Sequence, residues 1–143
     1  MIYLDNAATT AMYPECLDDF RKYGVDDFFN PSAYYAPAGG NAHVVAAARK
    51  TILSALGAPD GANLLFTASG SESDNIALRC CLKRKKGTVI VSALEHAAVF
   101  NTAKALEAEG YALKVAECDR SGAVIEDRLY DLIDEDTVLV SVM

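Results

Sequence analysis

The chain has 143 residues, of which 52% are hydrophobic and 23% are charged, as in an ordinary globular domain with a single core. Thirteen Lys and Arg against 20 Asp and Glu give a net charge of −7, which argues against nucleic-acid binding. Its one dense basic run, residues 83–86, is expected to complement the end of a helix. No apolar run approaches the ~18 residues of a membrane span, and we expect a cytoplasmic protein with neither membrane nor nucleic acid as partner.

The four cysteines, at positions 16, 80, 81 and 118, form no CxxC pair and have no histidine-rich partner segment. Cys80 and Cys81 are adjacent in the chain and cannot easily bridge each other. We therefore expect neither a disulfide framework nor a metal site, and interpret the cysteines as small buried apolar residues in a reducing cytosol.

The first part of the chain predicts two helices separated by a loop. Apolar residues at helical spacing indicate a helix over Met12–Tyr23, ended by Gly24. Residues 28–40 contain Asn-Pro, Pro-Ala and Gly-Gly pairs, which predict a loop that is rich in aromatic side chains. Asn41 is the expected N-cap of a long helix that ends near Leu56.

Strands and helices are expected to alternate from position 63 onward. Short apolar runs predict strands over Asn63–Phe66, Thr88–Ser92, Tyr111–Ala116 and Thr137–Val142, with helices ending near Lys85, Glu109 and Ile133 between them. Such alternation indicates an α/β fold, a mostly parallel sheet with helices on both faces. Ligands bind such sheets where loops leave the carboxyl ends of the strands.

The segment FTASGSESDN, residues 66–75, places Ser69, Gly70 and Ser71 at a turn from strand to helix. Free backbone N–H groups and the positive end of the helix would suit a phosphate, and Gly70 would allow its close approach. The spacing from Ser69 to Glu72 equally fits a capping box with no ligand. From spacing alone, both interpretations stay open.

Glu95 and His96 follow the predicted strand Thr88–Ser92. A histidine at the carboxyl end of a strand can stack on a flat cofactor or move protons, although a lone histidine is also common as a structural residue. The only other histidine, His43, lies in a predicted helix without polar partners in view, and we interpret it as structural.

Together, the segments IYLDNAATT (2–10), NPSAYY (30–35), FTASGSESDN, EHAAV (95–99) and TVLVSVM (137–143) resemble the NifS/IscS-type cysteine desulfurases. These are pyridoxal-phosphate enzymes of the class V aminotransferase group, and the resemblance extends over essentially the whole chain. Ala11, Tyr35 and Gly39 depart from the family pattern, which weakens expectations about substrate contacts more than those about the cofactor.

The resemblance implies the large domain of the fold-type I pyridoxal-phosphate enzymes, of which residues 1–143 would be the N-terminal portion. Residues 1–40 would form an N-terminal segment and active-site loop. Gly70 and Ser71 match the turn that binds the cofactor phosphate. His96 matches the histidine that stacks on the pyridine ring and takes part in proton transfer. Asp5 to Thr9 match a segment near the active-site entrance, to which no individual role is assigned.

Members of this family work as homodimers, take sulfur from L-cysteine, leave alanine, and pass the sulfur to an acceptor protein as a persulfide. The family's Schiff-base lysine, the aspartate that pairs with the pyridine nitrogen and the persulfide cysteine would all follow Met143. We therefore expect residues 1–143 alone to be an incomplete and inactive fold that binds pyridoxal phosphate weakly at best.

Two alternatives stay open beside this interpretation. The first is another member of the same group, an aminotransferase or selenocysteine lyase, because the residues that distinguish them would lie downstream. The second is a short, non-enzymatic binding or assembly module built on this half-fold. An exposed sheet edge and the charge of −7 would suit a protein partner for such a module.

Overall fold

The computed structural model describes residues 1–82 and 86–143, so most of the basic run at 83–86 and its expected role at a helix end lie outside the described residues. The chain divides into two units, Met1–Leu65 and Phe66–Met143, and each is described by itself. Within the described residues, no helix is both long and apolar enough to cross a membrane.

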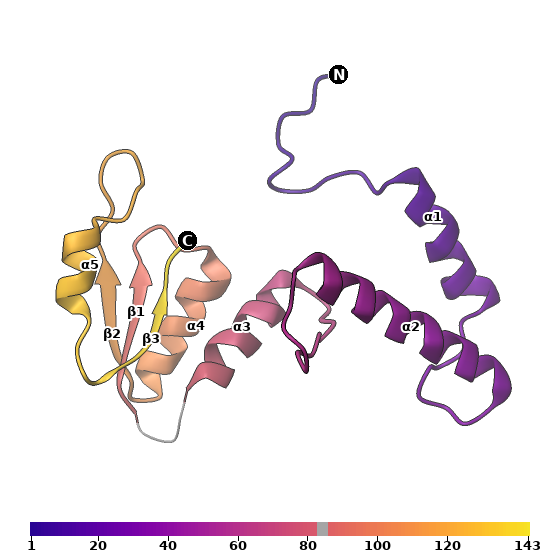
Figure 1. The fold of residues 1–143 in the computed structure, drawn as a ribbon. Coiled ribbons are helices and arrows are strands. Elements are labelled where there is room, and N and C mark those ends of the chain that lie inside the picture. Colours follow the sequence, from indigo (N-terminus) through magenta and orange to yellow (C-terminus); the bar gives the residue numbers. More distant parts are fainter. Residues whose placement is uncertain (83–85) are drawn as a thin grey trace. The chain divides into compact units, whose positions relative to one another are not determined.

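The second unit is built on a three-stranded sheet (Figure 1). Its strands are β1 (Thr88–Ser92), β2 (Ala112–Ala116) and β3 (Thr137–Ser141). The order is β2-β1-β3, and β1 pairs in parallel with both neighbours. All five residues of β1 are buried, as expected for the continuous apolar run of a strand covered on both faces. Three of the four predicted strands are therefore confirmed.

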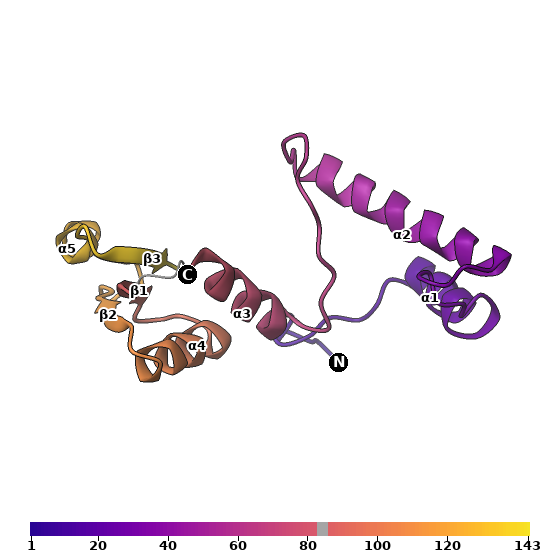
Figure 2. The same cartoon turned by 90° about the horizontal axis from the view of Figure 1, so that it is seen from below.

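Helices lie on both sides of this sheet (Figure 2). Helix α4 (Ala97–Ala108) joins β1 to β2 and packs on both, and α5 (Glu126–Leu132) joins β2 to β3 on the opposite side. Helix α3 (Gly70–Cys81) packs against α4. The buried core is a cluster between β1 and α4, formed by Val89, Val91, Ala103 and Leu106. The predicted α/β fold with a parallel sheet and helices on both faces is confirmed.

The first unit contains helices and no strand in the residues described. Helix α1 (Pro14–Arg21) runs directly into a π-helix, η1 (Lys22–Asp26), so Gly24 does not end the helix as predicted. Gly24 does not adopt the positive φ with which a glycine commonly ends a helix, so the helical turns continue through it. Helix α2 (Ala36–Ala55) is the longest element of the unit.

Helix α2 begins five residues before the predicted N-cap at Asn41, so that prediction is wrong. Pro37 lies in the first turn, where its missing N–H costs no hydrogen bond, and the helix continues through the two glycines after it. The Asn41 amide is instead a side-chain donor to the carbonyl oxygens of Asp27 and Phe29, the latter at 2.7 Å. Asn41 thus holds the preceding loop against the helix.

The predicted strand over Asn63–Phe66 is also wrong, because these residues form neither helix nor strand. Leu65 and Phe66 remain 63% and 49% exposed. A run of four residues has few backbone groups to pair, and a strand is stabilised only by a neighbour that pairs with it. Helix α3 also ends at Cys81, earlier than predicted, because Leu82 after it is extended.

Replacing Gly87 with Ala is expected to destabilise the sheet. The added Cβ would clash with the Asp136 carbonyl and lie 2.7 Å from Cγ1 of Val138. The carbonyl is held in place because it accepts a hydrogen bond of 2.8 Å from Thr88 N. We expect Gly87→Ala to lower the free energy of unfolding by about 1–3 kcal/mol in urea titrations. Gly70→Ala, whose Cβ meets nothing within 4 Å, is the matched control; equal stability of the two variants would contradict this prediction.

The loop before β3 predicts a pH dependence of stability. Lys114 Nζ donates to Asp134 Oδ2 at 2.9 Å, and Thr137 Oγ1 donates to Asp134 Oδ1 at 3.1 Å. The Lys114 hydrogen bond, and then the Thr137 one, lower the pKa of Asp134 from its ordinary value of 3.8. A lowered folded-state pKa contributes stability above the ordinary value and loses it as the pH falls through the folded-state value.

We therefore expect Asp134→Asn to lower the urea midpoint at neutral pH and to reduce the further loss of stability below pH 3.8. Glu135→Gln, an exposed carboxyl one position along the chain, is the control and should leave both unchanged. An unaltered acid slope in Asp134→Asn would contradict the assignment.

Candidate functional site

The turn into α3 is a variant of the capping box, in which the glutamate bonds to the N–H of the residue before the N-cap. Ser69 is the N-cap in extended conformation, and its Oγ accepts a hydrogen bond of 3.2 Å from Glu72 N. The Glu72 carboxylate reaches back, and its Oε2 accepts a hydrogen bond of 2.7 Å from Ala68 N. The capping interpretation of this sequence is thus confirmed, and the box satisfies the N–H groups of residues 68 and 72.

The capping box leaves the next two backbone donors of the turn for another partner. The N–H groups of Gly70 and Ser71 belong to the first turn of α3, where a helix has no carbonyl to receive them. A Cβ placed on Gly70 would meet nothing within 4 Å, so the space beside this backbone is open. The turn is braced by an Oγ1–Oγ hydrogen bond of 2.6 Å between Thr67 and Ser73. A capped helix start and an anion site are therefore compatible here.

His96 lies where the chain leaves β1, and it is the N-cap of α4. Its Nδ1 accepts a hydrogen bond of 3.1 Å from Ala98 N, and its carbonyl accepts bonds of 3.0 Å from Val99 N and Phe100 N. Because an N–H donates to Nδ1, the neutral ring carries its proton on Nε2. His96 is exposed, so its ring is accessible to a ligand.

Ser71 and His96 line one concavity of about 440 Å³ between α3 and α4. The structure thus brings together side chains that lie 25 positions apart in the sequence, with Gly70 next to Ser71. The other polar residues of the lining were not predicted from the sequence. Asn75 follows Ser71 by one helical turn, and this spacing could have revealed it. The lining consists of Ser71 and Asn75 of α3, with His96, Ala97, Ala98, Asn101, Thr102 and Ala105 of α4.

The polar lining residues also brace the concavity from within. Asn75 Nδ2 donates to the Ser71 carbonyl at 2.9 Å, and Thr102 Oγ1 donates to the Ala98 carbonyl at 2.7 Å. Both bonds turn side chains of α3 and α4 back onto their own helix starts. They hold the backbone next to Ser71 and His96 in place.

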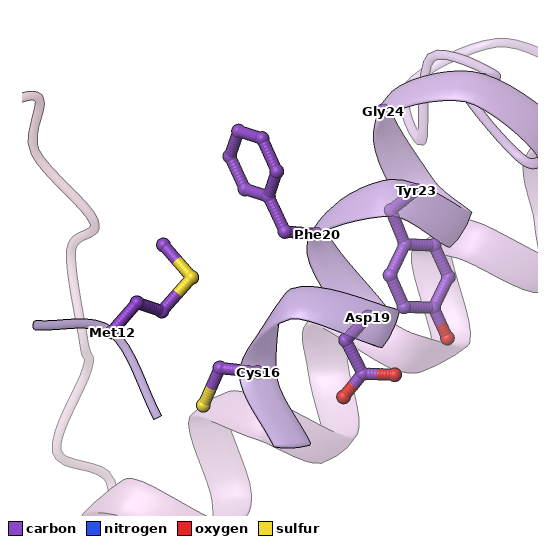
Figure 3. Close-up of a pocket in the computed structure, with 6 residues that line it drawn as sticks. All are labelled: Met12, Cys16, Asp19, Phe20, Tyr23 and Gly24. Carbon is purple, nitrogen blue, oxygen red and sulfur yellow. The ribbon is translucent and has the colours of Figure 1, made fainter. Parts of the chain in front are cut away.

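A second hollow of about 500 Å³ lies in the first unit, along α1 (Figure 3). Apolar side chains from Met12, Cys16 and Phe20 line it, together with Tyr23 and the carboxylate of Asp19. This hollow offers an apolar surface and the carboxylate of Asp19. It lacks the several hydrogen-bonding side chains, such as Ser71 and His96, that line the concavity between α3 and α4. We therefore place the candidate site at the α3–α4 concavity.

The remaining residues singled out in the sequence lie in the first unit. Asp5 to Thr9 form a turn: Ala8 N donates to the Asp5 carbonyl at 3.1 Å, and the Tyr3 hydroxyl donates to the same carbonyl at 2.8 Å. His43 is exposed on α2. All four cysteines are free thiols, but the prediction that they are buried is wrong, because three are exposed and Cys118 is half-buried. The part of the chain that the structure describes contains no group of three or more His, Cys, Asp or Glu that could hold a metal ion.

The model of the aminotransferase class-V family matches residues 2–143. The chain belongs to this family. A cysteine desulfurase IscS of Methanosarcina thermophila is 37% identical to it over 145 residues, and a cysteine desulfurase IscS of Clostridium botulinum is 35% identical over the same length. These matches cover 99% of this chain but only 36% of each relative, so the chain spans about a third of their length.

Solved structures give the same result for this class V family member. A NifS-like protein superimposes with a TM-score of 0.92 at 30% identity, over 99% of this chain and 40% of that one. A structure of SspA in complex with cysteine gives a TM-score of 0.85 at 29% identity, over 98% of this chain and 41% of that one. The resemblance to NifS/IscS-type desulfurases and the fold-type I assignment are thereby confirmed.

Proposed function

We propose that residues 1–143 form the N-terminal portion of the pyridoxal-phosphate domain of a cysteine desulfurase, which converts L-cysteine to alanine and passes the sulfur on as an enzyme-bound persulfide. One observation carries the proposal: Ser71 and His96, which match the family's phosphate and ring contacts, line a single concavity at the starts of α3 and α4. The desulfurases among the relatives support this chemistry over the other class V reactions.

The residues of the concavity fit pyridoxal phosphate in both size and chemistry. The free N–H groups of Gly70 and Ser71, the Ser71 hydroxyl and the positive end of α3 suit a phosphate. The open space beside Gly70 admits the phosphate oxygens, since a Cβ there would meet nothing within 4 Å. A volume of about 440 Å³ falls within the range of small-molecule sites.

In this assignment, each residue has a defined task. Gly70 and Ser71 bind the phosphate and so fix one end of the cofactor. His96 lies against the ring, and its Nε2–H is the atom that exchanges a proton, because Nδ1 is occupied by Ala98 N. When bound, pyridoxal phosphate supplies the electron sink that the reaction needs.

Catalysis needs residues that the family resemblance places outside residues 1–143. The chain spans about 36% of the length of its curated relatives. The resemblance assigns the Schiff-base lysine and persulfide cysteine to sequence that follows residue 143, so we infer that residues 1–143 alone do not catalyse the reaction. A homo-oligomer, a sulfur-acceptor protein and a cytoplasmic location stay predictions.

Substitutions in the concavity should separate binding from proton transfer in the full-length protein. We expect Ser71→Ala to weaken the affinity for pyridoxal phosphate about tenfold or more, because a hydrogen bond to a charged group is lost. We expect His96→Ala to lower kcat for alanine formation about 100-fold or more, as loss of a general acid or base does. Cofactor titration and an alanine assay with L-cysteine measure the two effects.

Matched controls come from the first unit. Ser54→Ala and His43→Ala remove an exposed serine and the chain's other histidine from α2 and should leave both quantities unchanged. Normal cofactor affinity in Ser71→Ala together with normal kcat in His96→Ala would overturn the proposed function.

Residues 1–143 on their own should form no stable covalent adduct with the cofactor. The chain holds seven lysines, none in the sequence context of the family's Schiff-base lysine. After incubation with pyridoxal phosphate and borohydride, peptide mass spectrometry should find at most low, scattered labelling. Stoichiometric labelling of one lysine within this chain would contradict the prediction.

A further inference from the structure

The carboxyl ends of two neighbouring strands are bridged by one side chain. Glu95 Oε1 accepts a hydrogen bond of 3.0 Å from Ser92 Oγ and another of 3.2 Å from Ser141 Oγ. Ser92 is the last residue of β1 and Ser141 is the last residue of β3, which pair in parallel. A single carboxylate oxygen therefore anchors the loop after β1 to both strand ends.

The bridge extends into the surrounding backbone. Ser92 is 1% exposed, and its hydroxyl also accepts a hydrogen bond of 3.3 Å from Met143 N. Glu95 N donates to the Ser92 carbonyl at 3.4 Å, so both the main chain and the side chain of Glu95 return to the end of β1. The loop between β1 and α4 is thus fixed at its last residue before His96.

His96 is held on its other side by α4. Its ring accepts the Ala98 N–H, and its carbonyl receives the first bonds of the helix. His96 therefore lies between two fixed points of the chain: the Glu95 bridge to the sheet before it and the first turn of α4 after it. Losing the Glu95 anchor would leave the loop free to move while α4 stayed folded.

We propose that Glu95, through Ser92 and Ser141, is a positioning residue that sets the direction of the His96 ring. It does so by fixing the loop so that Nδ1 meets Ala98 N while His96 lines the α3–α4 concavity. The catalytic meaning of this role rests on the proposed function, whereas the effect on the ring itself does not. In this role Glu95 acts through His96, and its Oε1 is occupied by the two hydroxyls.

The acceptor oxygen, rather than the negative charge, is the feature that this geometry uses. A carboxylate only accepts hydrogen bonds, and the side-chain amide of Gln keeps one such oxygen at the same reach. Glu95→Gln should therefore keep the bridge, and Glu95→Ala should lose it. Glu107→Ala removes an exposed glutamate from α4 and is the matched control.

The first experiment measures alanine formation by the full-length protein. We expect Glu95→Ala to lower kcat about 10- to 100-fold, as a small misplacement of a catalytic group does, with Glu95→Gln and Glu107→Ala close to the unsubstituted protein. In a His96→Ala background, Glu95→Ala should cause no further loss, because the two residues act as a unit. A further loss of the same size in that background would overturn the proposal.

The second experiment needs neither cofactor nor activity. In cofactor-free protein with ¹⁵N-labelled histidine, the His96 signal is identified by its absence in His96→Ala. We expect an unprotonated Nδ1 and a protonated Nε2 in the unsubstituted protein and in Glu95→Gln, and an averaged tautomer signal in Glu95→Ala. An unchanged His96 signal in folded Glu95→Ala would overturn the positioning role.

A milder variant keeps the test decisive if Glu95→Ala does not fold. Ser141→Ala removes one of the two hydroxyl donors and should shift the His96 signal and kcat in the same direction, by less; no shift in either would overturn the proposal. Full activity of His96→Ala together with normal cofactor affinity in Ser71→Ala would instead overturn the proposed function, and the ¹⁵N signals would still decide the role of Glu95.

Discussion

Strand β1 is the element on which the rest of the second unit depends. It pairs with strands on both sides, and its five residues are all buried. Because every pairing is parallel, the strand ends meet at one edge of the sheet, and the chain that leaves β1 there carries Glu95 and His96 directly into α4. The buried strand therefore fixes both the core and the position of the candidate site. A change that moved β1 along its neighbours would move His96 with it.

An element can be predicted from the sequence to the extent that it is determined by residues near it in the chain. β1 was predictable because a continuous run of apolar, mostly β-branched residues is typical of a strand that is buried on both faces of a sheet. The run Asn63–Phe66 is also mainly apolar but contains no β-branched residue, and whether it pairs depends on a neighbouring strand that composition does not reveal. Asn41 was misjudged for a related reason: it is a good cap by type, but its amide bonds to Asp27 and Phe29, residues distant in the sequence.

At the candidate site, the turn into α3 was predictable from the sequence. The proximity of Ser71 and His96 was predictable only in part. The spacing of Ser69 and Glu72 contains the capping box, because both partners lie within one helical turn. That Ser71 and His96 share a concavity depends on the packing of α3 on α4, which no local pattern states; the family resemblance supplied it. The Glu95 bridge to Ser141 joins residues 46 positions apart and could not be read from the sequence at all.

A capped helix start and a ligand-binding helix start are usually weighed as rivals, and here they are compatible. In α3, the capping box uses the N–H groups of residues 68 and 72 and leaves those of Gly70 and Ser71. In α4, the cap uses Nδ1 of His96 and leaves Nε2. Each cap holds the backbone still while it leaves a donor beside the same concavity. Because a preorganised donor needs no rearrangement when its ligand arrives, the caps favour binding rather than compete with it.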